Sequence, residues 1–184
     1  MHIVIAGSSG HLGQQLTRRL RRDGHSVVRL VRRPPEADDE RHWDPTVGML
    51  GVEVVDGADV VVNLCGSSLL GIPYSSRYLR ELRDSRVTPT RVLAEAIARS
   101  ERPAALINAN GSSGYGDHGA EEVTEASGMH GQEPLARITL EWEAATAPAV
   151  EAGARVCVLR TAPVMARGSA AMTCLLYTSP SPRD

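Results

Sequence analysis

The chain has 184 residues, a formal net charge of −2 at pH 7 and a hydrophobic content of 42%. This length is enough to bury one core. The small net charge gives no indication of nucleic acid or of an anionic membrane as a partner, and no apolar run is long enough to span a bilayer. We therefore expect a cytoplasmic globular protein without a signal peptide, and we expect its partner to be a small molecule.

All of the basic residues are arginine, and the sequence contains no lysine. This excludes a Walker-type phosphate loop, Schiff-base chemistry and pyridoxal chemistry, because each of them depends on a lysine amine. Cys65, Cys157 and Cys174 are far apart in the sequence, and two of them lie in apolar, strand-like segments. We expect reduced core thiols rather than disulfides. The histidines show no metal-ligand spacing, so no metal site is predicted.

The first apolar run, residues 3–6, predicts a strand, and a glycine-rich turn at residues 7–13 follows it directly. A helical pattern begins within this turn. The order of strand, glycine turn and helix is the one that binds the pyrophosphate of a dinucleotide. In this arrangement Gly7 turns the chain out of the strand, and Gly10 lets the backbone approach the diphosphate. Gly13 lets the helix pack closely on the sheet.

Further apolar runs without strict alternation predict strands that are covered on both faces. They lie at residues 26–31, 60–64, 104–109 and 155–159. Residues 34–58 are weakly patterned, and we expect a loop there with at most a degenerate third strand.

Helical spacing predicts three main helices between these strands. The first stops at Asp23-Gly24, the second runs from Ser76 towards Ser100, and the third runs from Leu135 to Val150. Pro89 lies inside the second helix and should kink or divide it. Strands that alternate with helices predict an α/β fold with a Rossmann-like, doubly wound parallel sheet and helices on both faces.

The end of the second strand bears on the choice of cofactor. A fold specific for NAD places an acidic residue about 20 positions beyond the glycine turn. Here the strand ends in Arg32-Arg33 instead, and an arginine can pair with a 2′-phosphate through its planar guanidinium. We therefore predict NADP rather than NAD. The alternative is that both side chains are simply solvated arginines.

Further short motifs follow the glycine turn in a fixed order: Trp43-Asp-Pro45, Asp59–Gly66, Asp84-Ser-Arg86, Tyr115, Trp142-Glu143 and Leu159-Arg-Thr161. Together with the Gly-x-x-Gly-x-x-Gly spacing, they resemble the atypical, epimerase-family branch of the short-chain dehydrogenase/reductases. The resemblance extends from Met1 to about Thr173. It implies an NAD(P)-dependent oxidoreductase that transfers hydride at a carbon bearing a hydroxyl or carbonyl group.

The resemblance also implies a set of cofactor-binding residues. In it, Gly66 lets the cofactor ribose approach the backbone, Arg86 neutralises phosphate or ribose oxygens, and Glu81 accepts hydrogen bonds. The alternatives are a small buried residue at Cys65 and ordinary helix-surface charges at Glu81 and Arg86. The complete set is Gly7, Ser9, Gly10, His11, Leu12, Gly13, Arg32, Arg33, Leu64, Cys65, Gly66, Glu81, Arg86 and Val164.

The catalytic pair of the superfamily, Tyr-x-x-x-Lys, is missing. The resemblance places Leu135 and Thr139 where these two residues would stand. Tyr115 is the best remaining candidate for a proton donor, and Asn110 could orient a carbonyl or a water. Without a lysine to assist it, Tyr115 would be a slow acid. The alternative is that Tyr115 is a packing residue of the glycine-rich turn around it.

The segment 174–184 breaks the pattern of the preceding residues and resembles the translated end of a sequencing adapter. We expect residues 1–173 to form the NAD(P)-binding domain, residues 174–184 to be a non-native tail, and a C-terminal substrate part to be missing. A natural flexible tail is the alternative. Besides an oxidoreductase, the sequence is compatible with a non-catalytic NADP(H)-binding or redox-sensing protein, and with an inactive fragment.

Overall fold

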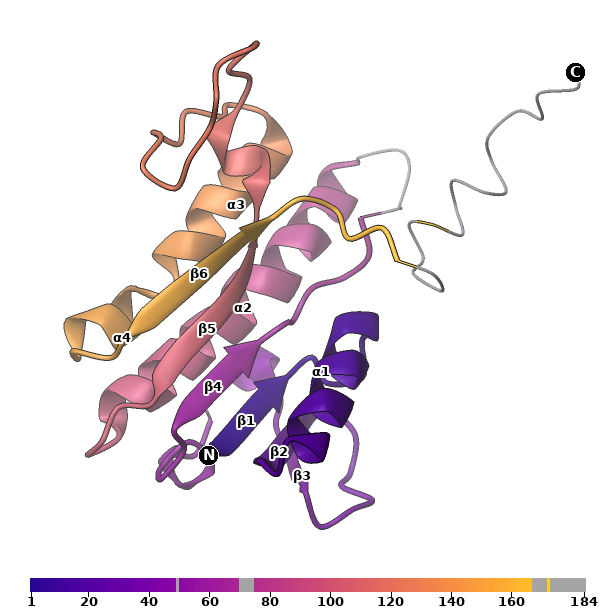
Figure 1. Ribbon diagram of the computed structural model, residues 1–184, viewed down its shortest axis with the longest axis vertical. Helices are drawn as coiled ribbons and strands as arrows, with labels where there is room; N and C mark the ends of the chain where they lie inside the picture. Colours follow the sequence, from indigo (N-terminus) through magenta and orange to yellow (C-terminus); the bar gives the residue numbers. More distant parts are fainter. Residues whose placement is uncertain (49, 70–74, 167–171, 173–184) are drawn as a thin grey trace, which may run out of the picture.

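The structure, a computed structural model, describes residues 1–48, 50–69, 75–166 and 172. Six parallel strands form one sheet in the order β3-β2-β1-β4-β5-β6 (Figure 1). Their bounds are β1 His2–Ala6, β2 Ser26–Val31, β3 Glu40–His42, β4 Val60–Asn63, β5 Ala105–Gly111 and β6 Val156–Thr161. The strand order reverses between β1 and β4. In a sheet of this kind, ligands bind in the crevice at the carboxyl ends of the two strands where the order reverses.

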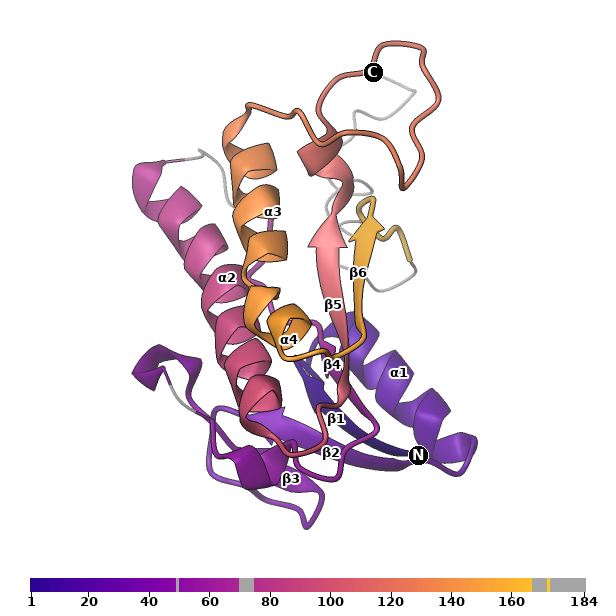
Figure 2. The ribbon, with the colours of Figure 1, turned by 90° about the vertical axis from the view of Figure 1, so that its left-hand side faces the viewer.

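Helices cover the sheet on both faces, as Figure 2 shows: α1 lies on one side of the strands, and α2, α3 and α4 lie on the other. The helices are α1 His11–Arg22, α2 Ser76–Arg99, α3 Pro134–Ala144 and α4 Ala147–Glu151. Short 3-10 turns occur at η1 Pro45–Val47, η2 Val52–Val54 and η3 Ser112–Tyr115. The prediction of a Rossmann-like, doubly wound parallel sheet is confirmed.

Alternate residues of the central strands pack into two separate hydrophobic cores. Val4 and Val61 are fully buried and join the cluster that contains Leu93 of α2. Their strand neighbours Ile5 and Val62 belong to the cluster that packs against the leucines of α1. Each fully buried aliphatic side chain contributes about 1.5–3 kcal/mol. The apolar runs of β1 and β4 therefore hold helices on both faces of the sheet.

One of the two effects predicted for Pro89 is excluded, and one helix prediction is corrected. Helix α2 is continuous over 24 residues, so Pro89, which is buried within it, does not divide it. The helix predicted for residues 135–150 consists of two helices, because α3 ends at Ala144 and α4 begins at Ala147. Pro148 lies at the start of α4, where its missing N–H is tolerated, whereas one continuous helix would need that N–H.

The prediction that Cys157 is a core thiol is wrong. Strand β6 lies at the edge of the sheet, and its residues alternate between half-buried and exposed. Val156 packs against the cluster beneath α2 and α4, while Cys157 and Leu159 are exposed. Helix α1 contacts β1 and β2 near the opposite edge. An apolar run at an edge strand therefore does not guarantee burial on both faces.

The weakly patterned segment 34–58 contains the short third strand β3, which pairs with β2 through residues 40–42. Within the described ranges, no helix combines the length and the apolarity needed to cross a bilayer. The expectation of a non-native tail at residues 174–184 falls outside the residues that the structure describes.

Candidate functional site

The glycine turn lies between β1 and α1, at the carboxyl edge of the sheet. Gly7 has φ +81°, and a Cβ atom there would lie 2.7 Å from the carbonyl carbon and oxygen of Leu64. A Cβ atom on Gly13 would lie 2.2 Å from the carbonyl oxygen of Gly7. Both contacts are with backbone atoms rather than with the end of a flexible side chain. The packing of the protein itself therefore requires glycine at positions 7 and 13.

Gly10 differs from the other two glycines. Its backbone is extended, with φ −71° and ψ 168°, which any residue can adopt. A Cβ atom there would meet only the carbonyl oxygen of Gly7, at 3.4 Å, and the residue is exposed. Packing within the chain thus does not explain this glycine. Open space in front of the backbone is what a close-lying diphosphate needs.

The first turn of α1 is suited to receive an anion. The N-cap residue Gly10 has no side chain to accept a hydrogen bond from the helix, and the first turn carries no acidic residue. Unpaired N–H groups at a helix N-terminus attract negative charge. Of the other predicted residues here, Ser9 is exposed and His11 is half-buried. Leu12 is an exposed hydrophobic residue.

Leu64, Cys65 and Gly66 leave the end of β4 beside the glycine turn, and a buried polar network holds this segment. The backbone N–H of Cys65 donates to Oδ1 of Asn63 at 3.1 Å. Nδ2 of Asn63 donates to Oδ1 of Asn108 at 2.7 Å and to Oγ1 of Thr90 at 2.8 Å. The indole N–H of Trp142 also donates to Oγ1 of Thr90, at 2.9 Å. Four elements, β4, α2, β5 and α3, thereby fix the start of the segment.

Cys65, in the segment after β4, is a neutral residue rather than a nucleophile. Burial raises the pKa of its thiol to about 12, and the positive charge of Arg32 opposes this only in part. A thiol with such a pKa carries almost no thiolate at neutral pH. Besides the hydrogen bonds from Thr46, the positive charge of Arg32 also contributes to lowering the pKa of Asp44.

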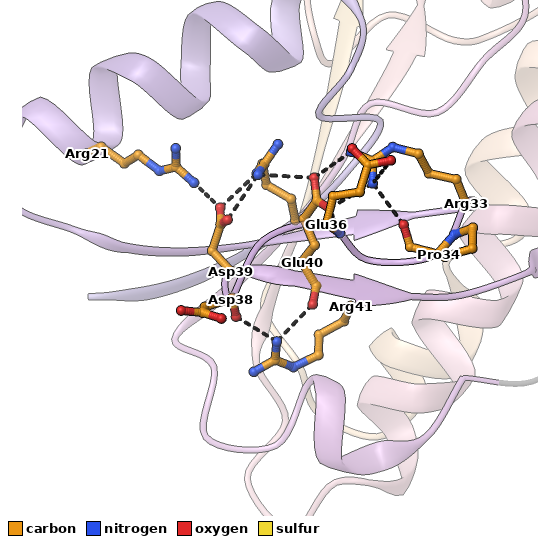
Figure 3. A network of polar contacts seen from close by, with 9 residues as sticks. Arg21, Arg33, Pro34, Glu36, Asp38, Asp39, Glu40 and Arg41 are labelled. Carbon is orange, nitrogen blue, oxygen red and sulfur yellow. Dashed lines mark hydrogen bonds and ion pairs between the residues drawn. The ribbon is translucent and has the colours of Figure 1, made fainter.

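The two arginines at the end of β2 have different environments. Nη1 and Nη2 of Arg33 bind both carboxylate oxygens of Glu40, at 2.9 and 2.8 Å, and Nη1 also donates to the carbonyl of Pro34. Figure 3 shows this pairing. Arg32 is exposed and has no hydrogen bond or ion pair within the described part of the chain. Arg32 therefore has its charge available, whereas that of Arg33 is already neutralised.

The carboxylate of Glu40 is the centre of a larger charge network (Figure 3). Its side chain is 1% exposed and also lies 3.1 Å from Nη2 of Arg29. Arg29 binds Asp39 through Nε, at 2.7 Å, and Arg21 pairs with the same carboxylate. The bonds from Arg33, together with one from the backbone N–H of Glu36, lower the pKa of Glu40 to about 2. Sequence reasoning missed this network, although the acidic run at residues 38–40 was a signal for it.

The remaining predicted cofactor residues are not all brought together. Arg86 is buried and donates from Nη2 to the carbonyl of Ser67 at 2.9 Å, which places it directly beside Gly66. Glu81 lies on the exposed surface of α2, away from the buried side that carries Arg86. Val164 follows β6 and is 40% exposed.

On the side expected for catalysis, the polar groups are engaged with each other. Nδ2 of Asn110 donates to the carbonyl of Thr139 and to Oε2 of Glu143, both at 3.3 Å, and its Oδ1 accepts from the N–H of Gly111. The hydroxyl of Thr139 lies 2.8 Å from that of Ser113 and donates to the carbonyl of Leu135. These contacts join η3 to α3.

Tyr115 is joined to a cation that sequence reasoning did not identify. Nη1 of Arg160, on β6, donates to the Tyr115 hydroxyl at 3.0 Å, and the guanidinium lies 5.4 Å from the centroid of the ring. Arg160 is also bound by both carboxylate oxygens of Glu143, at 3.0 and 2.7 Å. The only signal in the sequence was an arginine inside an apolar strand. Tyr115 also lines a polar hollow of about 680 Å³ together with residues 116–118, 121 and 130–133.

This arrangement agrees with comparisons to known proteins. The profile of the NAD dependent epimerase/dehydratase family matches residues 3–175. Epimerase family protein Mb2239 of Mycobacterium bovis is 41% identical over 163 residues, which are 89% of this chain and 54% of that protein. The chain spans about half the length of curated relatives that it matches.

Two solved structures are similar over almost the whole chain. A nucleoside-diphosphate sugar epimerase from Corynebacterium glutamicum is 37% identical with a TM-score of 0.82, covering 97% of this chain and 38% of that one. The human epimerase family protein SDR39U1, solved with NADPH, is 27% identical with a TM-score of 0.83, covering 96% and 59%. This chain therefore belongs to the NAD dependent epimerase/dehydratase family, because its fold, its glycine turn and the family match over residues 3–175 all agree.

Proposed function

We propose that the chain binds NADP(H) and is the cofactor-binding part of an oxidoreductase of this family. The observation that carries the proposal is Gly10, an exposed glycine in extended backbone that the packing of the chain does not require. It stands at the N-terminus of α1, where unpaired N–H groups favour an anion. A diphosphate against this backbone accounts for both features.

The preference for NADP over NAD is supported by the end of β2. Arg32, directly after the end of β2, is exposed and without an ion pair in the described residues. A free guanidinium at this place suits a 2′-phosphate. The human relative was solved with NADPH, whereas other structural neighbours were solved with NAD.

If the protein is catalytic, the reaction is hydride transfer between the nicotinamide and a carbon that bears a hydroxyl or carbonyl group. Tyr115 is the candidate proton donor and Asn110 the candidate orienting group. The hydrogen bond from Nη1 of Arg160 holds the Tyr115 hydroxyl in a fixed position.

A non-catalytic NADP(H)-binding or redox-sensing protein is the second candidate. It is favoured by Leu135 and Thr139, which replace the usual tyrosine and lysine, and by the internal hydrogen bonds of Asn110 and Thr139. A polar group already bonded inside the protein is less available to a substrate.

Binding and turnover separate these proposals. NADPH and NADH are titrated separately into the chain, with nicotinamide fluorescence as the readout, and NADPH is expected to bind more tightly. Equal affinity would contradict the NADP preference, and no binding of either would contradict cofactor binding. Carbonyl-dependent oxidation of NADPH by a full-length relative, tested with a panel of aldehydes and ketones, would favour the oxidoreductase. Tight binding by that relative without any turnover would favour the second candidate.

A further inference from the structure

The two edges of the sheet are built differently. Strand β3 forms one edge and β6 forms the other (Figure 1). An edge strand presents backbone N–H and C=O groups to which a further strand can pair, and a short length or charged side chains protect it. Strand β3 has only three residues, all of them polar. Nη1 of Arg41 also donates to the carbonyls of Asp38 and Glu40, both at 2.8 Å, as Figure 3 shows. This edge is therefore protected.

Strand β6 lacks these protections. It has six residues and contains neither a proline nor an acidic residue. Its one charged side chain, Arg160, lies on the side of α3, where both carboxylate oxygens of Glu143 bind it at 3.0 and 2.7 Å. Cys157 and Leu159 lie on the opposite face of the sheet and are exposed. An approaching strand would therefore meet apolar side chains, and the charge of Arg160 is already neutralised.

The backbone of β6 offers three residues to such a strand. The carbonyl of Arg155 accepts from the N–H of Leu106 in β5 at 2.8 Å. Backbone groups of successive residues in a strand point alternately to its two sides, so those of Val156, Val158 and Arg160 point away from β5. Each of these residues carries one donor and one acceptor. The edge thus holds a regular row of groups that water or another strand can satisfy.

We propose that β6 is a self-association edge, at which a second copy of this chain adds its own β6 in the antiparallel direction. A two-fold axis joins the same patch on both copies, and it makes two paired edge strands antiparallel. With Val158 on this axis, Val158 pairs with Val158 of the second copy, and Val156 pairs with Arg160. All three outward-facing residues of each copy then exchange hydrogen bonds. The proposal goes beyond the proposed function and does not depend on it.

The side chains favour a second copy as the partner. In the register centred on Val158, Cys157 lies opposite Leu159 of the second copy, on the same face of the joined sheet. Side chains opposite each other in an antiparallel pair have Cβ atoms about 4.5–5.5 Å apart, so apolar groups there are in contact. Leu159 is 40% exposed in the single chain and gains an apolar neighbour in this way. The strand is therefore complementary to itself in both its backbone and its side chains.

Sedimentation equilibrium of the whole chain in a reducing buffer is the first test. We expect a monomer–dimer equilibrium between micromolar and millimolar concentration. Leu159→Lys should raise the dissociation constant of the dimer at least tenfold, because a lysine on an edge strand opposes pairing. The matched control is Val47→Lys, at a 70% exposed position of η1 outside β6, which should dimerise like the native sequence.

A cysteine pair tests the register. Leu159→Cys places a thiol opposite Cys157 of the second copy, and oxidised glutathione accepts the two electrons when the disulfide forms. We expect a covalent dimer in which peptide mapping without reductant finds position 157 of one copy joined to position 159 of the other. Val47→Cys is the control and should give no bond between positions 47 and 157. A dimer of Leu159→Cys without the bond between positions 157 and 159 would contradict the pairing centred on Val158.

Amide hydrogen exchange identifies what covers the edge. We expect the amides of Val156, Val158 and Arg160 to become protected as the protein concentration rises. Protection that is already complete at the lowest concentration would mean that another segment of the same chain covers β6, and it would overturn the proposal. A native chain that stays monomeric over the whole range would overturn it too, as would equal dimerisation of the native sequence and Leu159→Lys.

Discussion

Arg33 and Glu40 form a bidentate ion pair in which the Glu40 side chain is 1% exposed and the Arg33 side chain is 46% exposed. The pair joins the turn after β2 to the first residue of β3. Its neighbour Arg32 has no such partner in the described part of the chain. Arg32 and Arg33 cannot be told apart from the sequence, but in the structure only Arg33 is held in an ion pair.

Arg32→Ala and Arg33→Ala should separate cofactor selection from stability. Loss of a charge-assisted contact to a 2′-phosphate should weaken NADPH binding in Arg32→Ala by about 1.5–3 kcal/mol, with little change for NADH. Arg33→Ala should lower the melting temperature because it leaves the buried Glu40 with fewer partners. Dissociation constants for both cofactors and melting curves measure these effects. If Arg33→Ala selectively lost affinity for NADPH and kept its melting temperature, Arg33 rather than Arg32 would bind the 2′-phosphate.

The Glu40 network predicts a pH-dependent contribution to stability. The folded-state pKa of Glu40 is lowered from 4.5 to about 2, chiefly by Arg33. A lowered pKa means that the ionised carboxylate stabilises the fold above about pH 4.5 and that this contribution is lost as the pH falls towards 2. Glu40→Gln should therefore melt at a lower temperature than the native sequence at pH 7, and the difference should shrink between pH 4.5 and 2.

The control for this pH series is Glu36→Gln. The Glu36 side chain is 73% exposed and lies 3.6 Å from Arg33, so this variant should change the melting temperature little at any pH. If the difference in melting temperature between Glu40→Gln and the native sequence stays constant from pH 7 to pH 2, the ionised pair is not its cause.

Gly10→Val should abolish tight NADPH binding while the fold persists. The backbone at position 10 suits any residue, and a Cβ atom meets only one protein atom at 3.4 Å. A branched side chain would instead fill the space in which the diphosphate must approach. Gln15→Val, at an exposed position of α1, is the control for adding valine to this helix. NADPH affinity and circular dichroism are the measurements, and native affinity in a folded Gly10→Val would refute the assignment of the turn.

We expect no robust carbonyl-dependent oxidation of NADPH by this chain, because neither a tyrosine nor a lysine stands at positions 135 and 139. Tyr115→Phe removes the hydroxyl that Arg160 binds, at a cost of about 1 kcal/mol in stability, and should leave NADPH affinity unchanged. Turnover by the native sequence that disappears in Tyr115→Phe would instead identify Tyr115 as the acid.

Alkylation should distinguish the two cysteines that the structure describes. Cys157 is exposed on the edge strand, whereas burial raises the pKa of Cys65 to about 12. Iodoacetamide at pH 8 should modify Cys157 within minutes and leave Cys65 unmodified in the native protein. Peptide mapping by mass spectrometry reports both sites, with the denatured chain as the reference. Rapid labelling of Cys65 in the folded protein would contradict its enclosure.

The sequence by itself determined the features that depend on local chemistry. Neighbouring residues set these features, because sterics and the need to bury apolar runs act over short distances. They are the apolar runs of β1, β2, β4 and β5, the glycine turn at residues 7–13 and the end of α1 at Asp23-Gly24. The Rossmann-like arrangement follows from their order, since parallel strands with intervening helices permit few topologies.

Tertiary structure alone decided which charges are free and which are paired. Glu40 lies seven residues beyond Arg33, and only the pairing of β3 with β2 brings it to that arginine rather than to Arg32. Arg160 reaches Tyr115 from a strand 45 residues away, and the enclosure of Arg86 depends on Trp142 of another helix. The free energy of a charged side chain depends on the atoms that surround it in space. Its function therefore could not be inferred from its position in the chain.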